Sequence, residues 1–168
     1  MTVAGGGQIE HFIKQANQLK IENCVEFLGV VPNNTVVNLM READVVLVPS
    51  RHEYPEGFPL TIYEALCSRT PLVASDHPMF RGNLEHGVNA MIFPAGHPNA
   101  LAASIETLLS DSLLYHRLSL ASCDAWQRLQ IPVKWGELIK RWLDNSPENK
   151  QWMFEHRLAS GLYNSPLS

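Results

Sequence analysis

The sequence has 168 residues, of which 45% are apolar, 18% charged and 8% aromatic. This composition is typical of a globular domain and excludes a disordered tail or a fibrous repeat. The formal net charge is −4, from 13 basic and 17 acidic side chains. Because affinity for a phosphate backbone requires clustered cations, the sequence predicts no nucleic-acid partner.

No segment of the sequence predicts membrane insertion or secretion. Apolar runs stay below the length of about 18 residues that spans a bilayer, and the first residues lack the charged-then-apolar pattern of a signal peptide. Cys24, Cys67 and Cys123 are far apart and odd in number, so we expect small buried side chains rather than disulfides or a metal site. These features favour a reducing cytoplasm.

Strands and helices alternate along the chain. Five short apolar segments predict strands, and they are residues 2–4, 25–28, 45–48, 72–74 and 90–93. Helical spacing of apolar side chains is found in residues 9–19, 34–40, 59–66, 98–109, 111–129 and 133–143. This alternation predicts a single Rossmann-like α/β domain over residues 2–143, with a mostly parallel, doubly wound sheet.

Residues 144–168 differ from the rest and predict a helical tail. Ser146 and Pro147 form a helix start, and Trp152, Phe154 and Leu158 give the segment that follows a large apolar load. A helix of this kind needs a surface to lie on, so we expect it to pack against this domain or against a neighbouring copy.

Ligands of open α/β sheets bind at the carboxyl ends of the strands. One such end is the glycine triplet at residues 5–7, which matches half of a dinucleotide-binding fingerprint. The third glycine of that fingerprint would fall at Glu10, whose carboxylate would repel a pyrophosphate. A tight strand-to-helix turn without a ligand is therefore favoured over a nicotinamide site.

The segment from Glu56 to Glu64 is the richest candidate site. Gly57 allows close backbone approach, and the N–H groups from Leu60 to Ile62 lie in the first turn of the expected helix. Such N–H groups lack partners within the helix and, with the helix dipole, attract anions. Flanked by two carboxylates, they could hold a phosphate between sugar hydroxyls. A capped helix with a surface glutamate is the alternative.

Glu56 and Glu64, with seven residues between them, resemble the paired-glutamate motif of glycosyltransferase family 4, the retaining enzymes of GT-B fold. Further segments resemble the family in the same order along the chain, and they are residues 25–29, 43–50, 64–66, 70–75, 87–90 and 98–101. The resemblance covers about residues 2–143.

The resemblance implies the carboxy-terminal, donor-binding domain of such an enzyme, acting on a nucleoside diphosphate sugar and an unknown acceptor. Glu56 would be the catalytic residue, in contact with sugar hydroxyls near the anomeric carbon, and Glu64 would bind the ribose. The family needs no metal or other cofactor, so none is expected. The diphosphate would be cradled by Gly57, Phe58, Pro59, Leu60, Thr61 and Ile62, and the base would be bordered by Gly29, Val30 and Val31.

Arg51, His52 and His77 flank this candidate site. Arg51 could donate to a phosphate or could be a solvated loop cation, and the sequence does not separate the two. We expect both histidines to be solvated loop side chains.

The sequence departs from the family in what it lacks and in one loop. The family's strand with an arginine and a lysine, which stabilise the leaving diphosphate, would precede Met1, as would the amino-terminal, acceptor-binding domain. In the family's order that strand lies between residues 2–4 and 45–48, so we expect these strands to close on each other, or another chain or segment to fill the slot. The family's paired glycines are replaced by His77, Pro78, Met79 and Phe80.

Whether the chain is an enzyme is left open by the sequence. One interpretation is a glycosyltransferase domain that acts with its amino-terminal domain or with a homo-oligomeric partner, and the other is a truncated, inactive nucleotide-binding or interaction module. We expect no sugar transfer by the isolated chain, because an acceptor held by a second domain is missing. The complete enzyme would lie in the cytoplasm, either free or peripheral to a membrane.

Overall fold

The computed structural model describes residues 1–130 and 133–162. Contacts divide the chain into two compact units, Met1–Trp126 and Gln127–Ser168. The division comes before the expected boundary at residue 143, because helix α6 (Trp135–Asp144) packs on helix α7 (Pro147–Glu155). Residues 163–168 of the expected tail lie outside the described residues.

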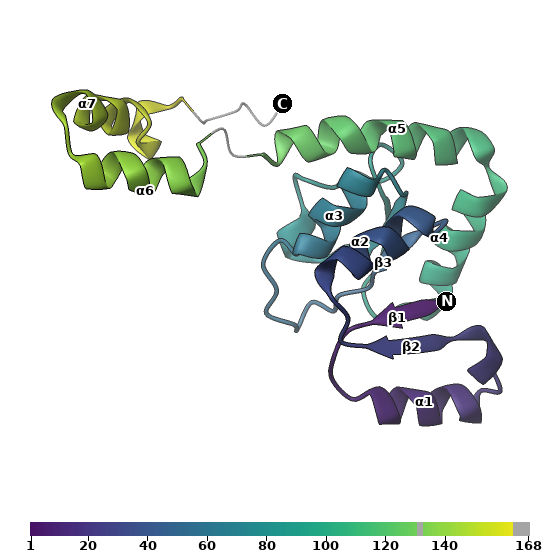
Figure 1. The fold of residues 1–168 in the computed structure, drawn as a ribbon. Coiled ribbons are helices and arrows are strands. Elements are labelled where there is room, and N and C mark those ends of the chain that lie inside the picture. The colour runs from purple at the N-terminus through teal and green to yellow at the C-terminus, as the bar shows by residue number, and fades with distance from the viewer. Residues whose placement is uncertain (131–132, 163–168) are drawn as a thin grey trace. The chain divides into compact units, whose positions relative to one another are not determined.

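The described residues of the first unit form five parallel strands in two sheets (Figure 1). In the smaller sheet, β1 (Thr2–Ala4) pairs with β2 (Glu26–Gly29). In the larger sheet, β4 (Leu72–Ser75) lies between β3 (Val46–Val48) and β5 (Met91–Phe93). The expected α/β class and the parallel pairing are confirmed, and each strand lies within one residue of its predicted segment.

The strands β1 and β3 do not pair with each other in the described part of the chain. Of the two alternatives expected for this slot, closure of the strands on each other is wrong, and its filling by another chain or segment stays a prediction. All three residues of β1 are exposed, so its unpaired backbone groups can bond to water and direct closure is not required.

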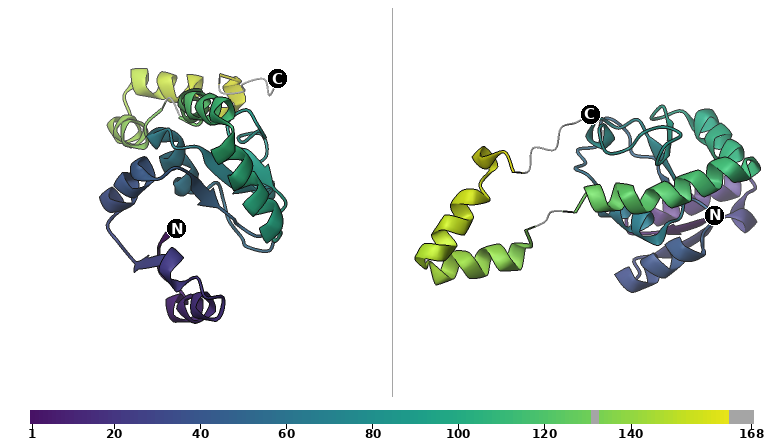
Figure 2. Two further views of the ribbon diagram at one scale, coloured as in Figure 1. Left: turned by 90° about the vertical axis from the view of Figure 1, so that its right-hand side faces the viewer. Right: turned by 90° about the horizontal axis from the view of Figure 1, so that it is seen from above.

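Helices connect the strands and cover the sheets. They are α1 (Ile9–Gln18), α2 (Asn33–Glu42), α3 (Leu60–Ser68), α4 (Pro98–Ser110) and α5 (Ser112–Arg128). Helix α1 lies along the β1–β2 pair, whereas α3 and α4 lie against the three-stranded sheet (Figures 1 and 2). The loop that leads to α3 leaves the carboxyl end of the three-stranded sheet, so the segment from Glu56 to Glu64 lies at that end.

Strand β4 is buried on both faces. Val73, which lies opposite Leu47 of β3 and Met91 of β5, packs into a core cluster with side chains of α4 and α5, among them Leu108 and Leu118. Side chains alternate along a strand, so the neighbours of Val73 point to the opposite face, where α3 contacts β4. Helices on both faces are what a doubly wound sheet requires.

Helix starts follow local side-chain chemistry. Helix α4 begins at Pro98, whose missing N–H is not needed in the first turn. Helix α5 begins after Asp111, because the carboxylate of Asp111 accepts from the N–H groups of Leu113 and Leu114 at 3.0 and 2.9 Å. Helix α7 begins at Pro147, as predicted, and the Ser146 side chain accepts from the Asn149 N–H.

The second unit is built around the contact between α6 and α7. The Arg141 guanidinium lies 4.4 Å from the centre of the Trp152 ring, which also stacks on the His156 ring at 4.0 Å between centres. Trp152 and Phe154 lie on α7, as predicted. Leu158 does not, because α7 ends at Glu155 and residues Leu158–Ser160 form a separate 3-10 helix.

Two further expectations from the sequence can be compared with the structure. Among the described residues, every helix is too short or too polar to cross a membrane. The expectation that the three cysteines are buried is wrong, since Cys24, Cys67 and Cys123 are all exposed. Cys67 follows the buried pair Ala65 and Leu66 on α3, and its position turns it away from the sheet.

Candidate functional site

The candidate site lies where β3 and β4 end side by side. The Ser75 hydroxyl at the end of β4 donates to the carbonyl oxygen of Ser50, which follows β3, at 2.6 Å. The loop of residues 51–59 leaves from this point and leads into α3. Because parallel strands end at the same edge of a sheet, residues 25 positions apart are brought into contact.

Glu56 is half-buried in this loop. Its carboxylate atom Oε2 accepts a hydrogen bond from the Ser50 hydroxyl, and its backbone N–H donates to the Tyr54 carbonyl at 2.8 Å. The Tyr54 N–H in turn donates to the Arg51 carbonyl at 3.0 Å. The loop is thus a series of tight turns that fixes both the backbone and the side chain of Glu56.

The amino terminus of α3 provides the expected anion-binding geometry, with fewer donors than expected. Pro59 precedes the helix without a capping side chain. The Ile62 N–H donates to the Pro59 carbonyl at 3.0 Å, and the Ile62 side chain is fully buried. Within the described residues, the N–H groups of Leu60 and Thr61 keep no protein acceptor, and both residues are exposed. Two helix donors, not three, therefore face solvent.

Glu64 lies one turn further along α3 and is half-buried. Its Oε1 atom accepts from the side-chain amide of Asn33 at 2.6 Å. Asn33 is the first residue of α2, which contacts α3. Sequence reasoning missed Asn33, although its position just after the β2 end at the head of a helix is a signal for a residue near the site.

The other candidate residues lie around these two glutamates. Gly57 is exposed, with open space where a side chain would be, and the Phe58 ring lies 5.1 Å from the Tyr63 ring, edge to face. At the end of β2, Gly29 has a φ of +67°, Val30 is 83% exposed and Val31 is half-buried. Arg51 is exposed and has no carboxylate partner among the described residues.

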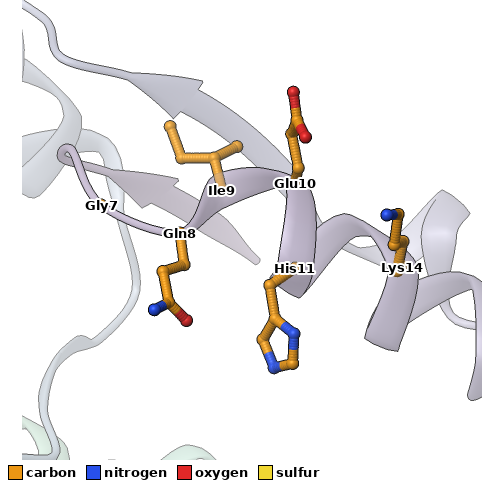
Figure 3. Close-up of a pocket in the computed structure, with 6 residues that line it drawn as sticks. All are labelled: Gly7, Gln8, Ile9, Glu10, His11 and Lys14. Atoms are coloured by element: carbon orange, nitrogen blue, oxygen red, sulfur yellow. The ribbon is translucent and has the colours of Figure 1, made fainter.

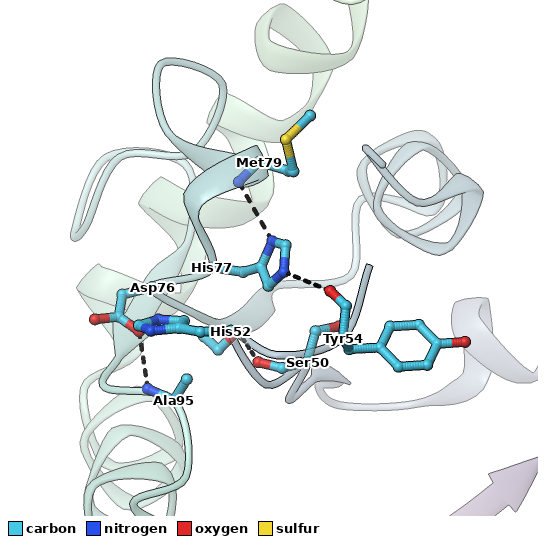
Figure 4. A network of polar contacts seen from close by, with 8 residues as sticks. Ser50, His52, Tyr54, Asp76, His77, Met79 and Ala95 are labelled. Atoms are coloured by element: carbon cyan, nitrogen blue, oxygen red, sulfur yellow. Dashed lines mark hydrogen bonds and ion pairs between the residues drawn. The ribbon is translucent and has the colours of Figure 1, made fainter. Parts of the chain in front are cut away.

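The expectation that both histidines are solvated is wrong for His77, whereas His52 is exposed as expected. His77 is 3% exposed and hydrogen-bonded through its ring to the Tyr54 carbonyl and the Met79 N–H. His52 pairs with the Asp76 carboxylate at 2.7 Å (Figure 4). The buried histidine had no signal in the sequence, because a polar residue beside a proline is typical of an exposed turn.

Asp76 joins the strand end to the next loop. The N–H of Ala95 donates to its Oδ1 atom at 2.8 Å. This hydrogen bond and the His52 ring hold the pKa of Asp76 below its usual value of 3.8, against the opposing effect of burial. The ionised carboxylate is therefore the form that the folded chain prefers.

The lowered pKa of Asp76 predicts an effect on stability in acid. Because the unfolded carboxyl takes up its proton at a higher pH than the folded one, the stabilisation is complete above pH 3.8 and is lost as the pH falls below it. Asp76 is 42% exposed, so we expect no more than about 1 kcal/mol. Urea unfolding of Asp76→Asn between pH 5 and pH 2.5 should show a shallower pH dependence than the wild type, with Asp124→Asn as the control. Parallel curves would contradict the prediction.

A shallow pocket lies at the amino terminus of α1, and its lining does not include Glu56 or Glu64 (Figure 3). Its lining comprises Gly7, Gln8, Ile9, Glu10, His11 and Lys14. Glu10 lies in the first turn of α1, where its charge opposes a bound phosphate, as the sequence analysis argued for the glycine triplet. In the described part of the chain, no three His, Cys, Asp or Glu side chains gather as metal ligands would.

These features define a class. Parallel strands covered by helices, here with a free helix terminus between two glutamates at their carboxyl end, are the fold of part of a GT-B glycosyltransferase. The sequence matches the family described as Glycosyl transferases group 1 over residues 1–122. The chain belongs to this family.

Two glycosyltransferases share about a third of their residues with this chain over the aligned length. It is 32% identical over 140 residues to the phosphatidyl-myo-inositol mannosyltransferase of Mycobacterium leprae, which covers 83% of this chain and 36% of that protein. It is 33% identical over 106 residues to the amylovoran biosynthesis glycosyltransferase AmsK of Erwinia amylovora, covering 61% of this chain and 26% of the relative. The chain thus spans about a quarter to a third of these relatives.

A solved structure gives the same fold. The Anabaena protein Alr3699/HepE in complex with UDP-glucose superposes on 77% of this chain and 36% of its own, with a TM-score of 0.67 and 28% sequence identity.

Proposed function

We propose that this chain is the carboxy-terminal, donor-binding domain of a retaining glycosyltransferase of family 4, which takes a sugar from a nucleoside diphosphate sugar. The observation that carries the proposal is the placement of Glu56 and Glu64 on either side of the two free N–H groups of α3. The Anabaena neighbour, 28% identical, is described in complex with UDP-glucose, and that supports a nucleotide sugar as the ligand here.

Each group then has a chemical task. The N–H groups of Leu60 and Thr61 bind the diphosphate, whose negative charge grows as the sugar leaves. Glu64 holds Asn33 through Oε1, which leaves Oε2 to accept from the ribose hydroxyls. Glu56 accepts from sugar hydroxyls near the anomeric carbon, and Gly29, Val30 and Val31 border the base. No metal is proposed, because backbone donors and the helix dipole serve the phosphates.

The partners and the location belong to the same proposal. The acceptor would be held by an amino-terminal domain, and a strand bearing an arginine and a lysine would enter between β1 and β3. The relatives include a phosphatidyl-myo-inositol mannosyltransferase and a D-inositol 3-phosphate glycosyltransferase. Because their names differ in sugar and acceptor, we propose neither for this chain. No disulfide joins the three exposed cysteines, which fits a reducing cytoplasm, with the complete enzyme free or peripheral to a membrane.

One observation favours a second candidate, a nucleotide-binding module without transfer activity. The sequence has no lysine or arginine from residue 52 to residue 68, so the phosphate site of this chain depends on backbone donors and on Arg51. Charge-assisted hydrogen bonds contribute about 1.5–3 kcal/mol each. A phosphate site with two fewer charge-assisted hydrogen bonds binds a nucleoside diphosphate about two to four decades more weakly.

Titration with UDP, followed by amide NMR and paired with a sugar-transfer assay, tests the proposal. We expect a dissociation constant of about 1 mM, because only backbone donors and Arg51 are available to the phosphates, with amide shifts at the start of α3. Transfer should be undetectable in the isolated chain, because the acceptor is not positioned. Turnover by the chain alone would overturn the domain interpretation. No shift with any nucleoside diphosphate at millimolar concentration would overturn nucleotide binding itself.

A further inference from the structure

The loop that carries Glu56 is tied to the segment that follows β4. Three consecutive residues, Ser75 at the end of β4 and then Asp76 and His77, contact the loop or Ser50 just before it. Ser75 bonds the Ser50 carbonyl, and Asp76 pairs with His52. The third contact is made by the ring of His77, which is buried, to the Tyr54 carbonyl (Figure 4).

The hydrogen bonds of His77 define its tautomer. The Met79 N–H donates to Nδ1 at 3.3 Å, so Nδ1 carries no proton. The other ring nitrogen, Nε2, lies 3.2 Å from the Tyr54 carbonyl oxygen, and a neutral imidazole then donates its single N–H to that oxygen. The ring is 3% exposed and lies 5.0 Å from the Phe80 ring. Its orientation is therefore fixed on two sides.

The Tyr54 carbonyl links His77 to Glu56. That oxygen accepts from the Glu56 N–H at 2.8 Å as well as from the His77 ring. The Glu56 carboxylate is held by the Ser50 hydroxyl, and Ser50 is held by Ser75. The side chain of Glu56 is thus anchored on the last residue of β4, and its backbone is anchored on His77 just after that strand.

We propose that His77 is the positioning residue of Glu56, acting through the Tyr54 carbonyl to set where the carboxylate meets the donor sugar. The inference rests on the proposed function. It depends on the His77 side chain, because a residue without a side chain at this position could not reach the loop. His77 itself does not touch the donor.

Three substitutions separate the two hydrogen bonds of the ring. His77→Gln can place an amide N–H near the position of Nε2 and keep the donor to Tyr54. His77→Asn can place an oxygen near the position of Nδ1 and keep only the acceptor for Met79. His77→Ala removes both. Met79→Ala is the matched control, because the Met79 side chain is half-exposed and its backbone N–H is retained.

Hydrogen–deuterium exchange of residues 51–57 in the full chain tests the tether without any ligand. We expect exchange to rise by about tenfold in His77→Ala and His77→Asn, as expected for loss of about 1.4 kcal/mol of local protection. Exchange in His77→Gln and Met79→Ala should stay close to the wild type. Unchanged exchange in both His77→Ala and His77→Asn would overturn the tether.

The affinity for UDP-glucose relative to UDP tests the positioning role. A general loss of structure would weaken both ligands, whereas a displaced Glu56 weakens only the sugar contact. We expect the ratio to fall by about threefold to tenfold in Glu56→Ala, His77→Ala and His77→Asn, and to recover in His77→Gln. A fall in Glu56→Ala with no change in His77→Ala and His77→Asn would overturn the inference alone. No effect of Glu56→Ala, or no binding by the wild type, would overturn the proposed function and the positioning role with it.

Discussion

Replacement of Leu118 by alanine should lower the free energy of unfolding by about 3 kcal/mol. Leu118 is fully buried in the cluster that joins α4 and α5 to the three-stranded sheet, and its loss leaves a cavity in addition to the lost burial. Leu120, on the same helix, is 63% exposed, so Leu120→Ala is the matched control, with a change within about 0.5 kcal/mol.

Urea unfolding followed by circular dichroism measures both variants. A Leu118→Ala chain as stable as Leu120→Ala would contradict the packing of α5 on the sheet. The prediction matters for the site, because the same sheet carries Ser50 and Ser75 at its carboxyl end. A chain that loses the core should also lose the dispersion of the amide signals from residues 50–64.

Glu64→Ala should weaken UDP binding by about tenfold or more, since a carboxylate hydrogen bond to a ligand contributes about 1.5–3 kcal/mol. From a millimolar starting point, the NMR titration should then no longer saturate. Glu56→Ala should leave UDP binding nearly unchanged, because Glu56 is proposed to meet the sugar and not the nucleotide.

Asn33→Ala separates ribose binding from the contact between helices. It breaks the same hydrogen bond between α2 and α3 that Glu64→Ala breaks, but it leaves the carboxylate in place. We expect a smaller loss of UDP affinity than in Glu64→Ala. Equal losses in the two variants would assign the effect to the helix contact and would contradict a direct role of Glu64 in binding the ribose.

Much of the fold could be predicted because apolar patterning marks buried strands. Residues 45–48 and 72–74 are continuous apolar runs, and the structure places them side by side in a parallel sheet with helices on both faces. Pro147 indicated a helix start because its missing N–H is not needed in the first turn, whereas Pro59 lies one residue before the start of α3.

Only the part of the site that lies in residues 56–64 could be predicted from the sequence. Glu56, Glu64 and the helix start between them lie within nine residues of sequence, so their proximity is local. Ser50, the partner of Glu56, is only six residues away, whereas Asn33, the partner of Glu64, follows another strand and is brought there by the packing of α2 on α3. The separation of β1 from β3 was missed because the sequence gives strand identity but does not specify which strand edges stay free.

The arrangement of the tryptophans has a consequence for the optical properties of this protein. All four follow residue 125, at Trp126, Trp135, Trp142 and Trp152, so three of them belong to the second unit and one ends the first. Emission from Trp152 is open to quenching by the His156 ring stacked on it. Intrinsic tryptophan fluorescence therefore comes mainly from α6 and α7, and it reports little on the site around Glu56 and Glu64. Fluorescence and circular dichroism melting curves will coincide only if the two units unfold together.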